Sequence, residues 1–137
     1  MSAMNDFNTR IIEEFRANNG TVGGPFEGAT ILLLHTRGAK SGLERVHPVV
    51  ARIDGDDIYV FASKAGAPTH PDWFHNLVAH PSVTVELKDE TFEATAEVLE
   101  GEERDRIFAD QAADYPDFAG YQAGTDRVIP VVRIVRS

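Results

Sequence analysis

A short turn combines glycine flexibility with positive charge and a hydroxyl group. Residues 36–42 read Thr-Arg-Gly-Ala-Lys-Ser-Gly, and Arg45 follows closely. The glycines permit a tight turn with exposed backbone N–H groups, and lysine and arginine add donors that suit phosphate or carboxylate groups. The segment predicts an anion-binding turn, although the turn alone fits the basic tip of an ordinary hairpin slightly better.

A second segment pairs a small, polar loop with a helix that carries the only tryptophan. Residues 62–68 read Ala-Ser-Lys-Ala-Gly-Ala-Pro and follow a predicted strand, and Pro71 can open a helix that runs to about Ala79. Trp73 and Asn76 are three residues apart and share a helix face. An aromatic plane beside an amide could line a flat heterocycle; the alternative is that Trp73 is a core residue.

A third candidate is aromatic. Tyr115, Phe118 and Tyr121 recur every three residues. They could border a pocket for a planar substrate, with tyrosine hydroxyls as proton donors, or they could simply cover the end of the fold.

Other catalytic chemistries lack support. The chain has no cysteine, which excludes disulfides, thiolate metal sites and cysteine nucleophiles. Neither Ser41 nor Ser63 lies in a Gly-x-Ser-x-Gly elbow. His70, His75 and His80 are five residues apart, so a helix cannot bring all of them to one face. We predict neither a catalytic triad nor a metal site.

The charge balance limits the partners. The formal net charge is −9 over 137 residues, which argues against nucleic acid as a partner. Cationic residues nevertheless gather between Arg37 and Lys64, so one small anion could bind there. The longest aliphatic run, Ala29–Leu34, is too short to span a bilayer, and the acidic N-terminal segment does not resemble a secretory signal. These features predict a cytoplasmic protein.

Hydrophobic periodicity predicts the elements that must position these groups. Helices are expected over 5–18, 71–79 and 101–113, strands over 31–34, 45–53, 58–62, 83–87, 92–98 and 128–135, and mixed loop and turn over 114–127. Pro48 suggests an edge or a bulge in its strand.

The order of these elements predicts the fold. Hairpins dominate and no βαβ rhythm appears, so we expect one mainly β (α+β) domain over residues 1–137. Its core is a split antiparallel β-barrel of about six strands, with an N-terminal helix and one or two connecting helices.

Together the three segments resemble the deazaflavin-dependent nitroreductase family, split β-barrel enzymes that use reduced coenzyme F420 and include F420H2-dependent quinone reductases. The similarity runs from Phe15 to Val132. Its most specific pieces are residues 38–42, 62–67 and 70–77, Tyr115-Pro116, Tyr121-Gln122 and residues 125–127.

The resemblance implies a set of site residues. The phosphate and oligoglutamate tail of the coenzyme would contact Lys40, Ser41, Gly42 and Arg45. The deazaflavin ring would lie along Pro48, Ala62, Ser63, Lys64, Trp73 and Asn76. The acceptor would be bordered by Tyr115, Phe118 and Tyr121, with Ser63, Tyr121 and Tyr115 as the catalytic candidates for hydrogen bonding or protonation.

The implied activity is hydride transfer from the reduced deazaflavin to a quinone-like or other conjugated small molecule. Four positions depart from common family patterns: Ala39 replaces an arginine, Val50 and Phe118 replace tyrosines, and Gly124 replaces a frequent tryptophan. These departures make nitroimidazole reduction doubtful.

Three alternatives stay open. The same barrel could bind FMN, or the chain could carry F420 without turnover. It could also contact the inner face of the cell membrane through Phe7, Ile11, Ile12 and Phe15, although the neighbouring glutamates favour core packing for this helix.

Overall fold

The computed structural model describes residues 3–18, 30–39, 42–55, 57–62, 70–88, 90–125 and 128–136, with side chains from residue 9 onward. The elements in chain order are α1 (Ala3–Ala17), β1 (Thr30–Arg37), β2 (Glu44–Asp54), β3 (Asp57–Phe61), α2 (Asp72–Ala79), β4 (Ser82–Leu87), β5 (Glu90–Val98), α3 (Gly101–Asp114), α4 (Asp117–Ala123) and β6 (Val131–Arg136).

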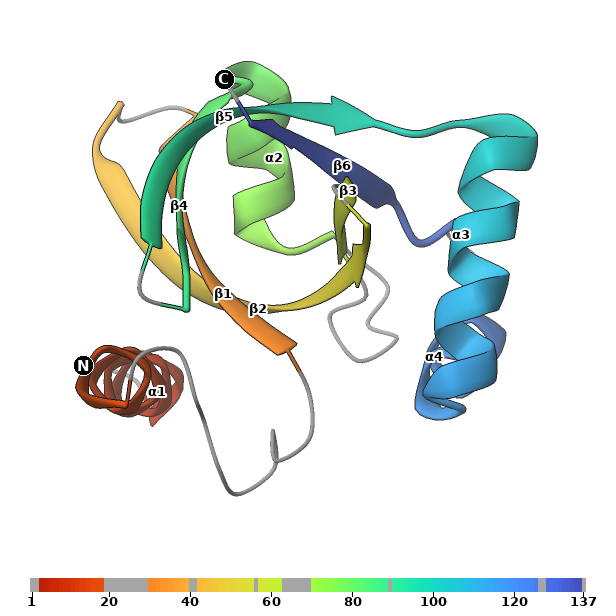
Figure 1. Ribbon diagram of the computed structural model, residues 1–137, viewed down its shortest axis with the longest axis horizontal. Coiled ribbons are helices and arrows are strands. Elements are labelled where there is room, and N and C mark those ends of the chain that lie inside the picture. Colours follow the sequence, from red (N-terminus) through yellow and green to blue (C-terminus); the bar gives the residue numbers. More distant parts are fainter. Residues whose placement is uncertain are drawn as a thin grey trace.

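The strands form a closed antiparallel barrel in the order β1-β2-β3-β6-β5-β4, which confirms the predicted barrel (Figure 1). Hairpins connect β1 to β2, β2 to β3 and β4 to β5, and every ladder is antiparallel. Gly55 and Lys88 have positive φ angles of 62° and 55° in two of these turns. Closure gives every strand two neighbours, although the first half of β2 pairs only with β1 among the described residues.

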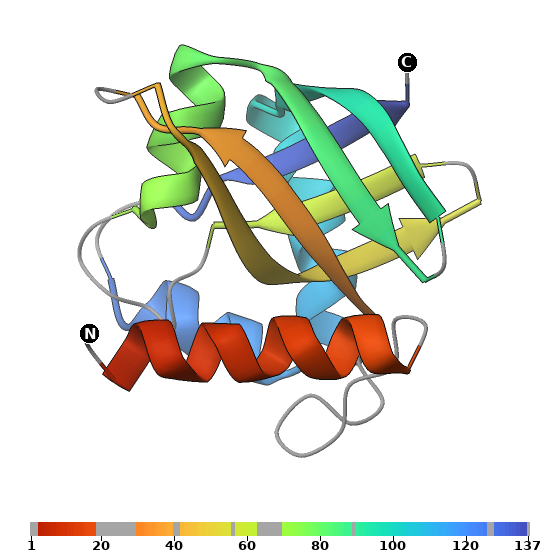
Figure 2. The ribbon, with the colours of Figure 1, turned by 90° about the vertical axis from the view of Figure 1, so that its left-hand side faces the viewer.

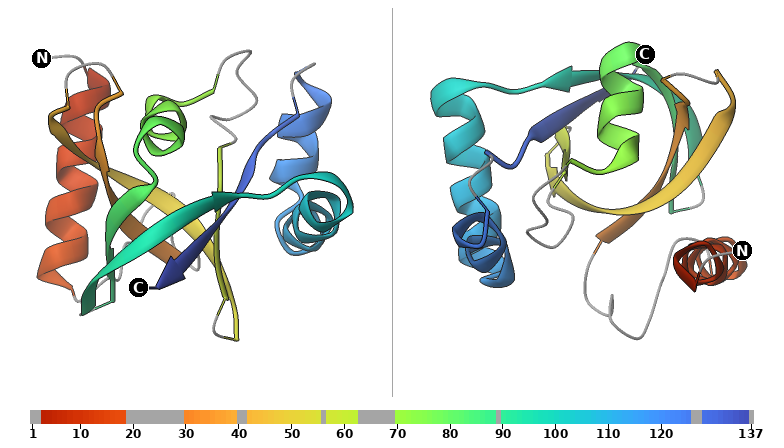
Figure 3. Two further views of the ribbon diagram at one scale, coloured as in Figure 1. Left: turned by 90° about the horizontal axis from the view of Figure 1, so that it is seen from above. Right: turned by 180° about the vertical axis from the view of Figure 1, so that it is seen from behind.

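Alternating side chains separate the interior of the barrel from its exterior. The interior is filled by aliphatic residues that are fully buried, among them Leu32, Leu34, Val60, Val85 and Val132. Trp73 and Leu77 of α2 belong to the same cluster, so α2 closes one end of the barrel (Figures 1 and 3).

Helices cover the outer faces of the barrel. Ile11 and Phe15 of α1 pack on Ile31 and Leu33 of β1, and Figure 2 shows α1 lying across the barrel. The predicted preference of this helix for core packing is therefore confirmed for Ile11 and Phe15, which are 6% and 2% exposed. On the opposite side, α3 and α4 pack on the outer faces of β3 and β6 (Figure 3).

One expected loop was wrong. Residues 114–127 contain the short helix α4, so three helices rather than one or two lie between strands in the described part of the chain. Pro116 and two glycines suggest a loop, but Phe118 packs edge-on against Phe61, with ring centroids 5.5 Å apart. This tertiary contact outweighs the weak helix propensity of the segment.

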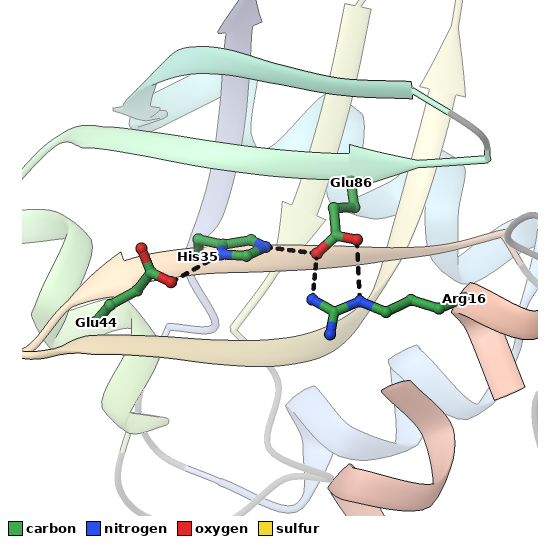
Figure 4. A network of polar contacts seen from close by, with 4 residues as sticks. All are labelled: Arg16, His35, Glu44 and Glu86. Atoms are coloured by element: carbon green, nitrogen blue, oxygen red, sulfur yellow. Dashed lines mark hydrogen bonds and ion pairs between the residues drawn. The ribbon is translucent and has the colours of Figure 1, made fainter. Parts of the chain in front are cut away.

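A charged network fastens α1 to the barrel (Figure 4). The Arg16 guanidinium donates hydrogen bonds to both carboxylate oxygens of Glu86, at 3.1 Å from Nε and 2.7 Å from Nη2. Nε2 of His35 lies 2.6 Å from Oε2 of Glu86, and its Nδ1 lies 3.3 Å from Oε1 of Glu44. The hydrogen bond from Arg16 lowers the pKa of Glu86; partial burial opposes this, and His35 lowers the pKa further.

This network predicts a pH-dependent contribution to stability. The pKa of Glu86 is lower in the folded protein than its ordinary value of 4.5, so its stabilising effect is present above pH 4.5 and is lost as the pH falls through the folded-state pKa. We expect Glu86→Gln to lower the free energy of unfolding at pH 7 by about 1 kcal/mol, because Arg16 is half exposed and water screens the pair.

Urea unfolding at pH 7 and at more acidic pH measures this difference, which should shrink as wild-type Glu86 becomes protonated. Glu93→Gln is the matched control, since Glu93 is exposed on the adjacent strand and has no ion pair within the described residues. An equal loss in both variants at pH 7 would contradict the assigned role of the network.

Candidate active site

The predicted anion-binding turn connects β1 to β2. The backbone N–H of Gly38 donates to the carbonyl of Leu43 at 2.8 Å, and that of Gly42 donates to the carbonyl of Gly38 at 2.9 Å. Gly42 adopts a φ of 71°, which glycine tolerates without strain. Lys40 and Ser41 lie outside the described residues.

Arg45 is available to an anion at this turn. It pairs with Thr36 in the β1–β2 ladder, one step from the end of β1, and its side chain is exposed. Within the described part of the chain, no carboxylate forms an ion pair with its guanidinium. This is the property expected of a residue that binds a ligand's phosphate or carboxylate groups.

The first half of β2 has only one neighbouring strand among the described residues. The β2–β3 ladder covers Ala51 to Asp54 of β2, so residues 44–50 pair with β1 on one side and with no described strand on the other. Pro48 lies in this section, opposite Leu33, which confirms the predicted edge position. Its side chain points outward, since Val49 and Ala51 point into the barrel.

The predicted heterocycle wall is only partly recovered. Trp73 and Asn76 share the buried face of α2, as expected, and each is 7% exposed. Trp73 packs among the barrel residues, together with the fully buried Ala62. Ser63 and Lys64 lie outside the described residues.

Asn76 uses both ends of its amide within the protein. Nδ2 donates to Oγ1 of Thr36 at 3.1 Å, and Oδ1 accepts from the backbone N–H of Ala39 at 3.0 Å. The resemblance places this residue beside the coenzyme ring, whereas its contacts in the structure join α2 to the anion-binding turn.

Sequence reasoning missed His47, which lies on the inner face of β2 near the start of α2. Its Nε2 is buried and has no hydrogen-bond partner in the part of the chain that the structure describes. Burial lowers the pKa of His47, the nearby charge of Asp72 raises it, and that of Arg45 lowers it. His47 is therefore neutral at pH 7. The alternation of β2, with Val49 and Ala51 also facing inward, was the available signal.

The three predicted aromatics differ in burial and lie on two helices. Phe118 is 8% exposed and lies between Phe61, Phe108 and Tyr121, in edge-on contacts with centroid separations of 5.4–6.4 Å. Tyr121 is half-buried on the same face of α4. Tyr115 caps α3 instead and is 39% exposed. Phe118 therefore supports α4 from the core, and the tyrosines are left as acceptor-side candidates.

A partly buried arginine that sequence reasoning also missed fixes α4. Arg104 donates to the carbonyl of Ile129 from Nε at 3.0 Å and from Nη2 at 2.8 Å, and Nη2 also lies 2.8 Å from Oε1 of Gln122. The same Gln122 oxygen accepts from the N–H of Ile129 at 3.0 Å. These bonds hold Gln122, and with it the adjacent Tyr121, against the segment that leads into β6.

The described residues show no cluster of three potential metal ligands. None of the described helices is long and apolar enough to cross a membrane. The rings of His70 and His75 lie 5.7 Å apart in an edge-on arrangement.

Fold and site together define a small antiparallel barrel that has a cationic glycine turn beside the half of β2 that pairs with β1 alone among the described residues. The chain belongs to the F420H(2)-dependent quinone reductase family, whose sequence model matches residues 8–135. An F420H(2)-dependent quinone reductase of Mycobacterium tuberculosis is 36% identical over 126 residues, which span 89% of this chain and 85% of that protein.

Two solved structures extend the comparison. An F420-H2 dependent reductase, FDR-A, has a TM-score of 0.69 and 41% identity, and the match covers 76% of this chain and 92% of that chain. A structure described as a domain-swapped dimer has a TM-score of 0.71 and 36% identity over 96% of this chain and 99% of that chain. Family membership agrees with the resemblance that the sequence motifs carry.

Proposed function

We propose that this chain is an F420H2-dependent oxidoreductase that reduces a quinone-like small molecule. Family membership supports the coenzyme, and the observation that carries the assignment to this site is Arg45, exposed and without a described ion-pair partner beside the glycine turn. The F420 tail is polyanionic, so the chemistry of this turn fits it. A cytoplasmic location completes the proposal.

The residues divide into three roles under this proposal. Lys40, Ser41, Gly42 and Arg45 hold the phosphate and glutamates of the tail. The ring lies along Pro48, Ala62, Ser63 and Lys64, and Trp73 and Asn76 support this site from α2. Ser63, Tyr115 and Tyr121 serve the acceptor.

When bound, the reduced coenzyme supplies a hydride, and the protein supplies binding, orientation and a proton or hydrogen bond for the reduced acceptor. Two apolar clusters lie on the outside of the barrel, one under α1 and one under α3 and α4. Val50 packs against both of them, so it lies on β2 between these helices. The apolar side chain of Val50 and the half-buried ring of Tyr121 suit a flat, conjugated substrate.

Titration with oxidised F420, followed by fluorescence, tests the coenzyme, with FMN titrated in parallel. We expect saturable binding of F420 and none of FMN at the same concentrations. Addition of benzoquinones and naphthoquinones to the complex with reduced F420 should then produce oxidised F420.

Other outcomes would overturn parts of the proposal. Binding of FMN in preference to F420 would favour the alternative cofactor. Tight F420 binding with no acceptor reduced would favour a carrier. Contact with a membrane through α1 is disfavoured because Ile11 and Phe15 are buried against β1.

A further inference from the structure

Asn76 joins three parts of the site. It lies on α2, three residues after Trp73, and bonds to Thr36 at the end of β1 and to Ala39 in the anion-binding turn. The orientation of the amide follows from its partners: the N–H of Ala39 can only donate, so the amide oxygen must face it. The amide nitrogen is then left to donate to the Thr36 hydroxyl.

The Thr36 contact is hidden from any ligand. Thr36 is 2% exposed and faces the barrel interior, and Asn76 is 7% exposed. A hydrogen bond between two buried groups is costly to break, because the partner left behind is unsatisfied in an apolar environment. Thr36 therefore fixes the Asn76 side chain in the orientation that presents its oxygen to Ala39.

Ala39 in turn immediately precedes Lys40 and Ser41. In the described residues, the turn itself is closed by the bonds of Gly38 with Leu43 and with Gly42. The Asn76–Ala39 bond adds the connection from this turn to α2. The helix that carries Trp73 thus also sets the position of the backbone next to Lys40.

We propose that Thr36 and Asn76 are positioning residues that hold the Ala39 backbone, and so the described end of the anion-binding turn, in place for the coenzyme tail. Asn76 acts through the backbone of Ala39, and Thr36 acts through Asn76. The inference rests on the proposed function, since it concerns binding of F420. Under this proposal Thr36, which faces the barrel interior, affects the affinity of the protein for the phosphate and glutamates of F420.

The test is Thr36→Val, which keeps the shape of the side chain and removes the acceptor for Asn76. Affinity is measured for intact F420 and for the deazaflavin with its ribityl chain but without phosphate or glutamates. We expect the Kd of F420 to rise about five- to tenfold, as for one lost hydrogen bond. The Kd of the tail-less compound should not change.

Thr84→Val is the matched control. Thr84 is half-buried on β4, and the described residues show no hydrogen bond to its side chain. Thr84→Val should change neither the Kd of F420 nor that of the tail-less compound. In the double variant Thr36→Val/Asn76→Ala, the loss should be close to that of Asn76→Ala alone, because both changes break one chain of contacts.

A general loss of structure would weaken both compounds equally and would overturn the inference, as would unchanged F420 affinity in folded Thr36→Val. Hydrogen exchange of the Ala39 amide gives a readout without coenzyme, and Thr36→Val should accelerate it. If the wild type does not bind F420, the proposed function fails. Unchanged Ala39 exchange, in contrast, would refute the Thr36–Asn76 connection itself.

Discussion

Replacing both Lys40 and Arg45 with alanine is expected to raise the Kd for F420 by about two orders of magnitude. Charge-assisted hydrogen bonds are each worth about 1.5–3 kcal/mol, and the pair offers at least two of them to a polyanionic tail. Arg45 is exposed next to the turn and has no described ion-pair partner, so its removal breaks no contact that the structure shows within the protein. The change is measured by fluorescence titration.

A charge-matched control separates the effect of these two residues on F420 binding from the effect of a lower overall positive charge. Lys88→Ala/Arg106→Ala removes the same charge from exposed positions on a hairpin turn and on α3. It should leave the Kd within about twofold of the wild-type value, because exposed charges more than a Debye length away are largely screened. Raised salt should weaken the wild type more than the Lys40/Arg45 variant. Unchanged affinity in that variant would refute the tail assignment.

The barrel could be predicted because each strand carries its own periodic pattern. Val83 and Val85 alternate with polar residues and face the interior, and the continuous apolar run from Ile31 to Leu34 is buried on both faces. This second pattern has a physical cause: α1 covers the outer face of β1, so no position in the middle of the strand meets water. Local sequence also marked the turn at Gly42.

Helix α4 and the role of Asn76 could not be predicted from local sequence patterns, because both depend on residues far away in the chain. The α4 segment is stabilised by contact of Phe118 with Phe61 and Phe108, which no local pattern encodes. The spacing of Trp73 and Asn76 correctly gave a shared face. The spacing could not show that this face points into the barrel, or that the amide nitrogen of Asn76 already donates a hydrogen bond to Thr36.

In the candidate site, too, local residue types could be interpreted from the sequence, whereas long-range contacts could not. Residue types identified the cationic turn, and the structure adds that Arg45 is exposed there and that the adjacent half of β2 lacks a second described strand. His47 and Arg104 escaped notice because their significance lies in burial. His47 has a buried ring nitrogen without a described hydrogen-bond partner, and Arg104 ties the segment before β6 to α4.

Tyr121→Phe is expected to lower turnover with quinones by about 100-fold and to leave the Kd of F420 nearly unchanged. Hydride transfer to a quinone leaves an oxyanion that needs a proton or a hydrogen bond, and one such donor is commonly worth about 10²–10³ in kcat. Tyr121 is half-buried beside Phe118, with ring centroids 5.4 Å apart, and the structure shows no hydrogen bond from its hydroxyl to another described group. Its hydroxyl therefore has no hydrogen-bond partner among the described residues, whereas Phe118 has no donor to give.

Tyr115→Phe is the matched comparison, since Tyr115 also carries a hydroxyl but lies exposed at the end of α3. We expect a smaller fall in turnover for this variant. Single-turnover oxidation of reduced F420 separates the chemical step from product release, and a loss confined to that step is typical of an interaction made mainly in the transition state. If Tyr121→Phe instead abolishes F420 binding, Tyr121 belongs to the coenzyme site. If it changes neither quantity, the tyrosine only covers the site, and a carrier without turnover becomes the better description of the protein.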